Sequence, residues 1–445
     1  MIQRRTFLAG TSASALLATC PSIVRGQNLN SRLQVAGIGC DGKGWTDIKE
    51  VAGHEQSAFI GFCDVDLNRT QKVKGLAPDA PVFQDYKEMM GALGAKIDAV
   101  TVSTPDHMHA HITLEAMRQG KHVYCQKPLT HNVWESRQIG NLAAQSDVIT
   151  RMGNQIHSHT FYRTAVAALQ AGVIGKVKQV HSWSAATGHG KSGHISTPKN
   201  PPALPEGVDW NLWIGVAPMR EYGGDRVYHP FGWRDWQDFG NGALGDFGCH
   251  ILDPVFTALE INKAPISMKA THSGMNDQVW PAQTKVEYVF PGTPWSTGSS
   301  LPITWYDGGL RPSVRGSHIP PTASIPSSGS MFIGEKGTAV LQHMGRLVLH
   351  PIEQFGDDAF TDVESVNHYH GWVDGCVSGK QPSDGFGYAS KLTEAVLLGN
   401  IAVRFPKTKL LWGEQAMKVT NLPEANQWLS REYRDGWEIT PVESK

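Results

Sequence analysis

Three residues, Lys127, Asp246 and His250, have the types and spacing to act on a hydroxyl group. Lys127 ends an apolar run, and an ammonium group there could hold a hydroxyl and stabilise an alkoxide-like oxygen. Asp246 and His250 lie one helical turn apart, so on a helix they share a face with Cβ atoms about 5–6 Å apart. A carboxylate there could orient an imidazole that collects the hydroxyl proton. Taken alone, Lys127 is better explained as a solvated lysine at a strand end than as a catalytic group. On spacing alone, Asp246 and His250 are explained equally well as a catalytic pair or as an acid at a helix N-terminus and a histidine in the core.

A glycine-rich turn near the start of the chain predicts the redox partner for this chemistry. The apolar run from Leu33 breaks into Gly37, Gly39 and Gly42, the spacing of a dinucleotide-binding turn. We expect Gly37 to form the tight turn, Gly39 to let the backbone touch a pyrophosphate, and Gly42 to let the next helix pack closely. Because the chain has 47 glycines, this spacing alone also fits an ordinary strand-to-turn junction.

The residues around this turn favour NAD as the cofactor. A second apolar run ends in Asp64, about 20 residues after Gly42, where an acid would hold the ribose 2′-hydroxyl. A carboxylate there would repel the 2′-phosphate of NADP, although the nearby Arg69 keeps NADP open. We expect Cys40 and Asp41 of the turn to contact the cofactor as well.

Two α/β domains are predicted from the hydrophobic pattern. From residue 32 to 153, apolar strands alternate with helical patterns, which is typical of a Rossmann-type, doubly wound parallel sheet that binds ligands at its carboxyl edge. From residue 154 to 445, longer alternating runs predict an α/β domain with a large open, mostly antiparallel sheet. Its C-terminal helices, near 366–376 and 392–404, could pack back on the first domain. The loop 307–330 is long enough to be a mobile lid or a partner-binding loop.

Five motifs in order give the chain a family resemblance. They are the glycine turn, Asp64, Ser103-Thr104-Pro105-Asp106-His107-Met108-His109, Gln126-Lys127-Pro128, and Gly242-x-x-x-Asp246-x-x-x-His250. Together they resemble the glucose–fructose oxidoreductase / inositol dehydrogenase / rhizopine-catabolism (Gfo/Idh/MocA) family.

The resemblance implies roles for several residues. Lys127 corresponds to the active-site lysine, Asp246 and His250 to an acid–histidine pair, and Thr104, Pro105 and His109 to a loop beside the cofactor. Gln126 departs from the family's Glu-Lys-Pro, which removes a carboxylate beside Lys127 and leaves that lysine's protonation open.

The expected reaction is hydride transfer between a tightly bound nicotinamide and a secondary hydroxyl of a sugar or polyol. Two alternatives stay open: redox-neutral cleavage of a glycoside through a keto-sugar, and a non-catalytic sugar or nucleotide sensor. Trp233, Arg234 and Asn154 are candidate substrate contacts. Trp233 is explained equally well as a residue packed in the core, and Asn154 equally well as a turn residue.

The N-terminal residues 1–27 predict twin-arginine export to the periplasm. Arg4 and Arg5 precede Phe7-Leu8 and a mild apolar run. The alternative is a frayed basic terminus of a cytoplasmic enzyme. Because the periplasm has no nicotinamide pool, an exported enzyme should hold its cofactor tightly.

Composition limits the partners. The net charge of -1 gives no electrostatic footprint for nucleic acid, and the N-terminal apolar run is too short for a stable membrane span. The cysteines lack Cys-x-x-Cys spacing, and His107, His109 and His111 alternate on a predicted helix without sharing a face, so we expect no metal. The expected partners are a small carbohydrate and further copies of the chain, as a homodimer or homotetramer.

Overall fold

The first domain is a doubly wound parallel sheet. The computed structural model describes residues 32–356 and 358–443, so the proposed export signal, 1–27, lies outside the described residues. Six parallel strands lie in the order β3-β2-β1-β4-β5-β6, which confirms the Rossmann-type sheet. The strands are β1 Leu33–Ile38, β2 Ser57–Cys63, β3 Val82–Phe83, β4 Ala99–Val102, β5 His122–Gln126 and β6 Thr150–Gly153.

Local sequence signals start the helices that connect these strands. Asn132 and Glu135 form a capping box at the start of α5, as expected for that spacing, and Asp85 caps α3 by accepting from the Lys87 N–H. The helices are α1 Lys43–Ala52, η1 Leu67–Arg69, α2 Gln71–Leu76, α3 Tyr86–Leu93, α4 Asp106–Arg118 and α5 Val133–Ala143.

The second domain is built on a nine-stranded sheet. Its order is β13-β12-β11-β7-β10-β9-β8-β14-β15, and all neighbours except β7 and β10 are antiparallel, as expected for a mostly antiparallel sheet. The strands are β7 Val177–Trp183, β8 Ser267–His272, β9 Thr284–Pro291, β10 Ser300–Tyr306, β11 Gly329–Gly334, β12 Thr338–Gln342, β13 Leu347–His350, β14 Lys409–Gly413 and β15 Lys418–Val419.

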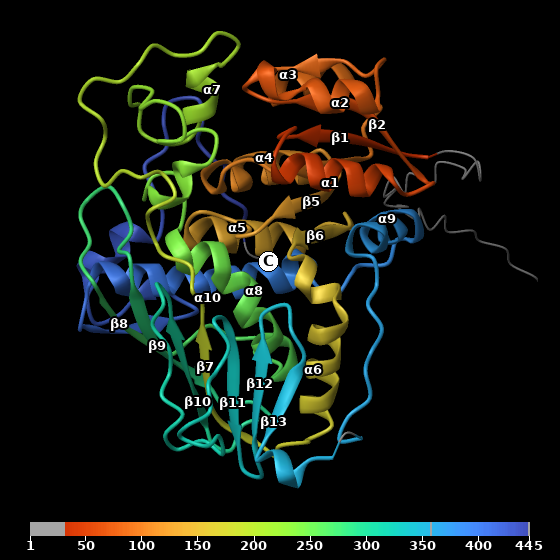
Figure 1. The fold of residues 1–445 in the computed structure, drawn as a ribbon. Coiled ribbons are helices and arrows are strands. Elements are labelled where there is room, and N and C mark those ends of the chain that lie inside the picture. The colour runs from red at the N-terminus through yellow and green to blue at the C-terminus, as the bar shows by residue number, and fades with distance from the viewer. Residues whose placement is uncertain (1–31, 357, 444–445) are drawn as a thin grey trace, which may run out of the picture.

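Two long helices, α8 (Gly242–Ala258) and α10 (Phe386–Arg404), lie between the two sheets (Figure 1). Both are largely buried, because apolar residues occupy nearly all of their faces. α9 (His368–Ser378) packs on α1, and its Asp374 Oδ1 lies 3.0 Å from Nε2 of His54, two residues after α1 ends. The remaining helices are η2 Gln155–Ser158, α6 Thr160–Gln170, α7 Trp210–Ile214, η3 Gly232–Asp235, η4 Ile352–Gln354 and η5 Pro423–Trp428.

The loop between β10 and β11 covers the outer face of the second sheet. Its Val314 and Ile319 pack in one apolar cluster with Trp183 of β7 and Met331 of β11, whereas Phe332 faces the main core. The predicted lid is therefore a packed cover on the sheet, and none of its residues lines the cavity described below. No helix among the described residues has the length and apolar character to span a bilayer.

Candidate active site

One continuous cavity of about 740 Å³ runs between the two domains. Its walls include the glycine turn and Asp64 at one end and Lys127, Asp246 and His250 at the other. The carboxyl ends of β1, β2, β4 and β5 all open into it, which is where doubly wound sheets bind their ligands. The sequence-predicted cofactor and chemical residues therefore meet in a single space.

The backbone of the turn is shaped by glycines, with roles that differ from those expected. Gly39 and Gly42 take positive φ angles of 86° and 58°, and a Cβ on Gly39 would lie 2.6 Å from the Ser103 carbonyl oxygen. A Cβ on Gly44 would lie 2.1 Å from the Gly39 carbonyl oxygen, so Gly44, and not Gly42, lets α1 approach the strand. Gly37 lies within β1, where a Cβ would lie 2.8 Å from Ile48, so it serves packing and not the turn.

Asp64 is held at the end of β2 by backbone donors. Its carboxylate accepts the N–H groups of Cys40 at 2.8 Å and Asp66 at 3.0 Å, and burial raises its pKa. Each carboxylate oxygen keeps a lone pair for a further donor such as a ribose hydroxyl. Arg69, which kept NADP open, is paired with Asp41 at 2.8 Å.

These residues fit a dinucleotide. The turn brings Gly39 and Gly42, which carry no Cβ atom, to the cavity before the N-terminus of α1, and Asp41 and Asp64 line the cavity beside them. Gly37 and Cys40 do not line the cavity and act from behind its wall.

Lys127 is tied to Asp246, the residue expected to pair with His250. The Lys127 Nζ donates to the Asp246 carbonyl oxygen at 2.6 Å and to Oδ1 at 2.7 Å, and Lys191 Nζ lies 2.6 Å from Oδ2. Although burial opposes ionisation, Lys127, Lys191 and Arg234 hold the pKa of Asp246 well below its usual range. Asp246 is thus joined to two lysines and has no hydrogen bond to His250 in the part of the chain that the structure describes, so its expected role as the orienting partner of His250 stays a prediction.

His250 presents a neutral imidazole to the cavity. Burial, together with Lys127 and His343, holds its pKa well below the usual range. Its ring lies 5.7 Å from that of His343, and its Nδ1 has no hydrogen-bond partner among the described residues. An unprotonated ring with a spare nitrogen can accept a proton.

Gln126 contacts a carboxylate supplied by another element. Its Nε2 donates to Asp47 Oδ2 on α1 at 2.7 Å. The fully buried Asp47 also accepts from Ser103 at 2.8 Å and Tyr369 at 3.1 Å, and pairs with Lys43 at 2.8 Å. Gln126 thus serves as an amide donor to Asp47, while Lys127 takes its carboxylate partner from Asp246.

The loop after β4 closes this part of the wall. Thr104, Pro105, Asp106 and His109 line the cavity, and the His109 ring spans the carbonyl oxygens of Thr104 and Pro128, both at 2.8 Å. Burial, together with Asp246, raises the pKa of Asp106 to about 7 despite the opposing charges of Lys127 and Arg234.

Of the three predicted substrate contacts, two line the cavity and one does not. Trp233 and Arg234 line the cavity, with the Arg234 guanidinium 4.2 Å from the centre of the Trp233 ring. Asn154 is fully buried behind the cavity, where its amide donates to Cys249 O at 3.0 Å and Asp253 Oδ2 at 2.7 Å. Its amide is used to fix α8, so its expected role as a substrate contact is wrong.

The three alternating histidines of α4 face different partners. His107 bonds the Trp213 carbonyl oxygen at 3.0 Å and His111 bonds Tyr86 at 2.6 Å, whereas His109 spans two loops. No group of three or more metal-binding side chains is assembled within residues 32–356 and 358–443.

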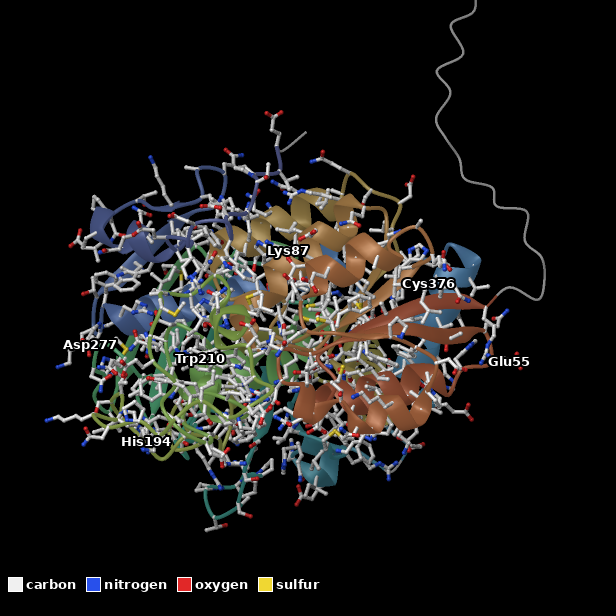
Figure 2. The ribbon with its side chains drawn as sticks, turned by 90° about the horizontal axis from the view of Figure 1, so that it is seen from above. Glu55, Lys87, His194, Trp210, Asp277 and Cys376 are labelled. Atoms are coloured by element: carbon white, nitrogen blue, oxygen red, sulfur yellow. The ribbon has the colours of Figure 1, made fainter. Side chains whose placement is uncertain are left out.

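A segment of the second domain, residues 205–231, covers the β2 end of the cavity. Val208 forms an antiparallel bridge with Asp66, Gly207 accepts from Leu67 N at 3.0 Å, and His229 Nε2 lies 2.9 Å from Asp66 Oδ2. Asp209 N donates to the Val65 carbonyl oxygen at 2.8 Å, and Figure 2 labels the next residue, Trp210, within this segment. Six of its residues line the cavity: Leu212, Trp213, Arg226, His229, Pro230 and Phe231.

Sequence reasoning missed these contacts as well as Lys191. The covering segment has no periodic pattern. Lys191, however, stands between Gly190 and Gly193 in a glycine-rich stretch, a signal for a basic side chain on a tight loop.

Comparison with known proteins identifies the family. Residues 33–154 match the profile described as "Oxidoreductase family, NAD-binding Rossmann fold", and residues 167–292 match "Oxidoreductase family, C-terminal alpha/beta domain". The chain belongs to the Gfo/Idh/MocA oxidoreductase family, and its first domain is an NAD-binding Rossmann domain.

Individual relatives are distant. Inositol 2-dehydrogenase 2 of Paenarthrobacter aurescens is 28% identical over 42% of this chain and 57% of its own length. Levoglucosan dehydrogenase of Pseudarthrobacter phenanthrenivorans is 23% identical over 35% of this chain and 32% of its own length. The chain thus spans about half the length, or less, of these curated relatives.

Solved structures share the fold. The WlbA dehydrogenase of Bordetella pertussis, solved with NADH and UDP-GlcNAcA, has a TM-score of 0.59 at 14% identity, covering 86% of this chain and 99% of that one. The aldose-aldose oxidoreductase of Caulobacter crescentus, solved with glycerol, has a TM-score of 0.56 at 15% identity, covering 85% and 99%.

Proposed function

We propose that this protein transfers hydride between a tightly bound NAD and a secondary hydroxyl of a sugar or polyol. The observation that carries the proposal is the single cavity that joins the glycine turn to Lys127 and His250. Relatives named inositol 2-dehydrogenase and levoglucosan dehydrogenase support a carbohydrate substrate.

The chain's own residues handle the oxygen and its proton. Lys127 uses two donors on Asp246, which leaves one N–H of its ammonium group for the reacting oxygen. His250 accepts the hydroxyl proton at its neutral ring, and Asp246 positions Lys127. Bound NAD supplies the hydride acceptor, so the C–H and O–H bonds break as the carbonyl forms. In the reverse direction His250 returns the proton.

Variants of both residues test this division of roles. Lys127→Met and His250→Asn should each lower kcat by about 100-fold or more, because each removes a group that acts on the developing charge or the proton. Lys269→Gln, an exposed change on β8, serves as the control. Full turnover by Lys127→Met on an identified substrate would refute the assignment.

A redox-neutral cycle is the second candidate, and the covering segment favours it. A cofactor enclosed by residues 205–231 suits a reaction that returns its hydride within each cycle, as in glycoside cleavage through a keto-sugar. Chromogenic glycosides incubated with the protein and no added cofactor distinguish the two. Chromophore release supports cleavage, and no release across a broad panel leaves net oxidation or reduction.

Export and assembly complete the proposal. Arg4 and Arg5 support twin-arginine export to the periplasm, which N-terminal sequencing of the mature protein from its native host tests. We also propose a homodimer or homotetramer, because the family often assembles through its open sheet. Light scattering on the purified protein gives the number of subunits.

A further inference from the structure

Positive charge exceeds negative charge at the reaction end of the cavity. Asp246 is contacted by Lys127 at 2.7 Å, Lys191 at 2.6 Å and Arg234 at 3.8 Å, so one carboxylate faces three cations. The side chains of these four residues are only 15–22% exposed, so water screens their charges weakly. Asp106, the other carboxyl group in this wall, is close to half protonated at neutral pH.

The other end of the cavity is balanced. Arg69 and Lys72 both pair with Asp41, with Asp64 close by, and Lys43 pairs with Asp47. The excess is therefore local to the reaction end, and Arg226 of the covering segment adds a cation beside it by stacking on the same Phe231 ring as Arg234. Partly buried cations that share a single carboxylate are costly, and an anionic ligand reduces that cost.

We propose that the substrate is a carbohydrate bearing an anionic group, a carboxylate or a phosphate. The anionic group pairs with Arg234, which lines the cavity, and is attracted by Lys191, which lies behind the wall on Asp246 Oδ2, while a ring hydroxyl of the same sugar contacts Lys127 and His250. Arg234 is well placed for this role because its guanidinium lies over Trp233, which fixes its plane and leaves N–H groups for an oxyanion. This inference rests on the proposed hydride transfer and specifies its substrate class.

Sugars with and without a negative charge test this proposal. Calorimetry on the protein with its bound cofactor uses glucuronate, its neutral methyl ester, a hexose phosphate and glucose. The ester keeps the hydroxyls of glucuronate and removes only the charge. We expect at least one anionic sugar to bind about tenfold or more tightly than its neutral counterpart, and the preferred anion tells carboxylate from phosphate.

Variants of Arg234 and Lys191 test whether these two side chains attract the anionic group. Arg234→Gln and Lys191→Gln should each weaken anionic-sugar binding by about tenfold, weaken neutral-sugar binding clearly less, and raise KM for the anionic sugar more than they lower kcat. Lys269→Gln is the matched control for a charge removed far from the cavity. A merely structural role would weaken neutral and anionic sugars alike.

The outcomes distinguish this inference from the proposed function. Turnover of neutral sugars with no preference for anions overturns the inference and leaves hydride transfer standing. Tight binding of an anionic sugar that never changes the cofactor's absorbance supports the binding site and refutes hydride transfer. Absence of binding by both anions overturns the inference.

Discussion

Asp106 is a residue of the site whose carboxyl group has a pKa near neutral. Its carboxyl group is 3% exposed and accepts a hydrogen bond from Asn241 at 3.2 Å. Lys127 and Arg234 favour its ionised form, but burial and Asp246 outweigh them and raise its pKa to about 7. The folded state therefore binds this proton in a pH range where the unfolded chain, with the ordinary value of 3.8, has released it.

Asp106→Asn should stabilise the protein increasingly as pH rises. Between pH 3.8 and about 7, the carboxyl group of Asp106 binds a proton in the folded wild type but not in the unfolded chain, so the free energy of unfolding of wild type falls relative to that of the variant as pH rises. Above about pH 7 the difference between the two proteins is constant. The full difference is about 4 kcal/mol, from about 1.4 kcal/mol for each unit of pKa shift. Thermal unfolding of both proteins at about pH 5 and about pH 8 checks it. An equal Tm difference at the two pH values would contradict the shifted pKa.

Asp47 connects four elements around one buried carboxylate. It lies on α1 and accepts from Gln126 at the end of β5, Ser103 after β4 and Tyr369 of α9. Because three distant segments donate to it, the carboxylate fixes the base of the loop that carries Lys127. A second carboxylate at position 126 would lie against Asp47 in a buried site.

Exchanging the acid and amide tests this connection. Gln126→Glu alone should destabilise the protein by about 3 kcal/mol near neutral pH and less in acid, where the two carboxyl groups share a proton. The double variant Asp47→Asn/Gln126→Glu should recover most of that loss, since one acid and one amide again meet. Denaturant unfolding of both, with Asp47→Asn as control, measures the recovery. Strictly additive losses would show that residues 47 and 126 act independently.

The same elements show how far sequence reasoning reaches. The hydrophobic pattern predicts both sheets, and Lys127 is found because it follows a buried strand. β11 and β12 give no alternating pattern to recognise, because both of their faces are buried, one by the core and one by the loop after β10. The pairing of Asp246 could not be predicted from helical spacing, because Lys191 is remote in sequence and its position depends on the folded loop.

At the scale of the whole molecule, the two domains enclose the cavity jointly. The first domain supplies the turn, Asp64 and Lys127, and the second supplies α8 and the covering segment 205–231. Release of a dinucleotide therefore requires this segment to separate from Asp66, Leu67 and Asn68, the last of which donates to Glu206 O at 2.7 Å. The arrangement favours retention of the cofactor over exchange in each cycle.

Loosening the covering segment should speed cofactor release. The double variant Asn68→Ala/His229→Ala removes two of its hydrogen bonds to the first domain, which together contribute about 1–3 kcal/mol, and should raise the release rate about tenfold. Release is followed after dilution by the fluorescence of bound reduced cofactor. Glu55→Ala, on the exposed surface of the first domain, is the control. A release rate equal to wild type would show that the segment does not retain the cofactor.

The most direct test of hydride transfer is the near-ultraviolet absorbance of the cofactor bound to the purified protein, recorded as a carbohydrate is added without free NAD. We expect the band of reduced nicotinamide to rise in wild type with a carbohydrate substrate and to stay flat in Lys127→Met with the same carbohydrate. No change with any acidic or neutral carbohydrate, or an equal rise in Lys127→Met, would contradict the account.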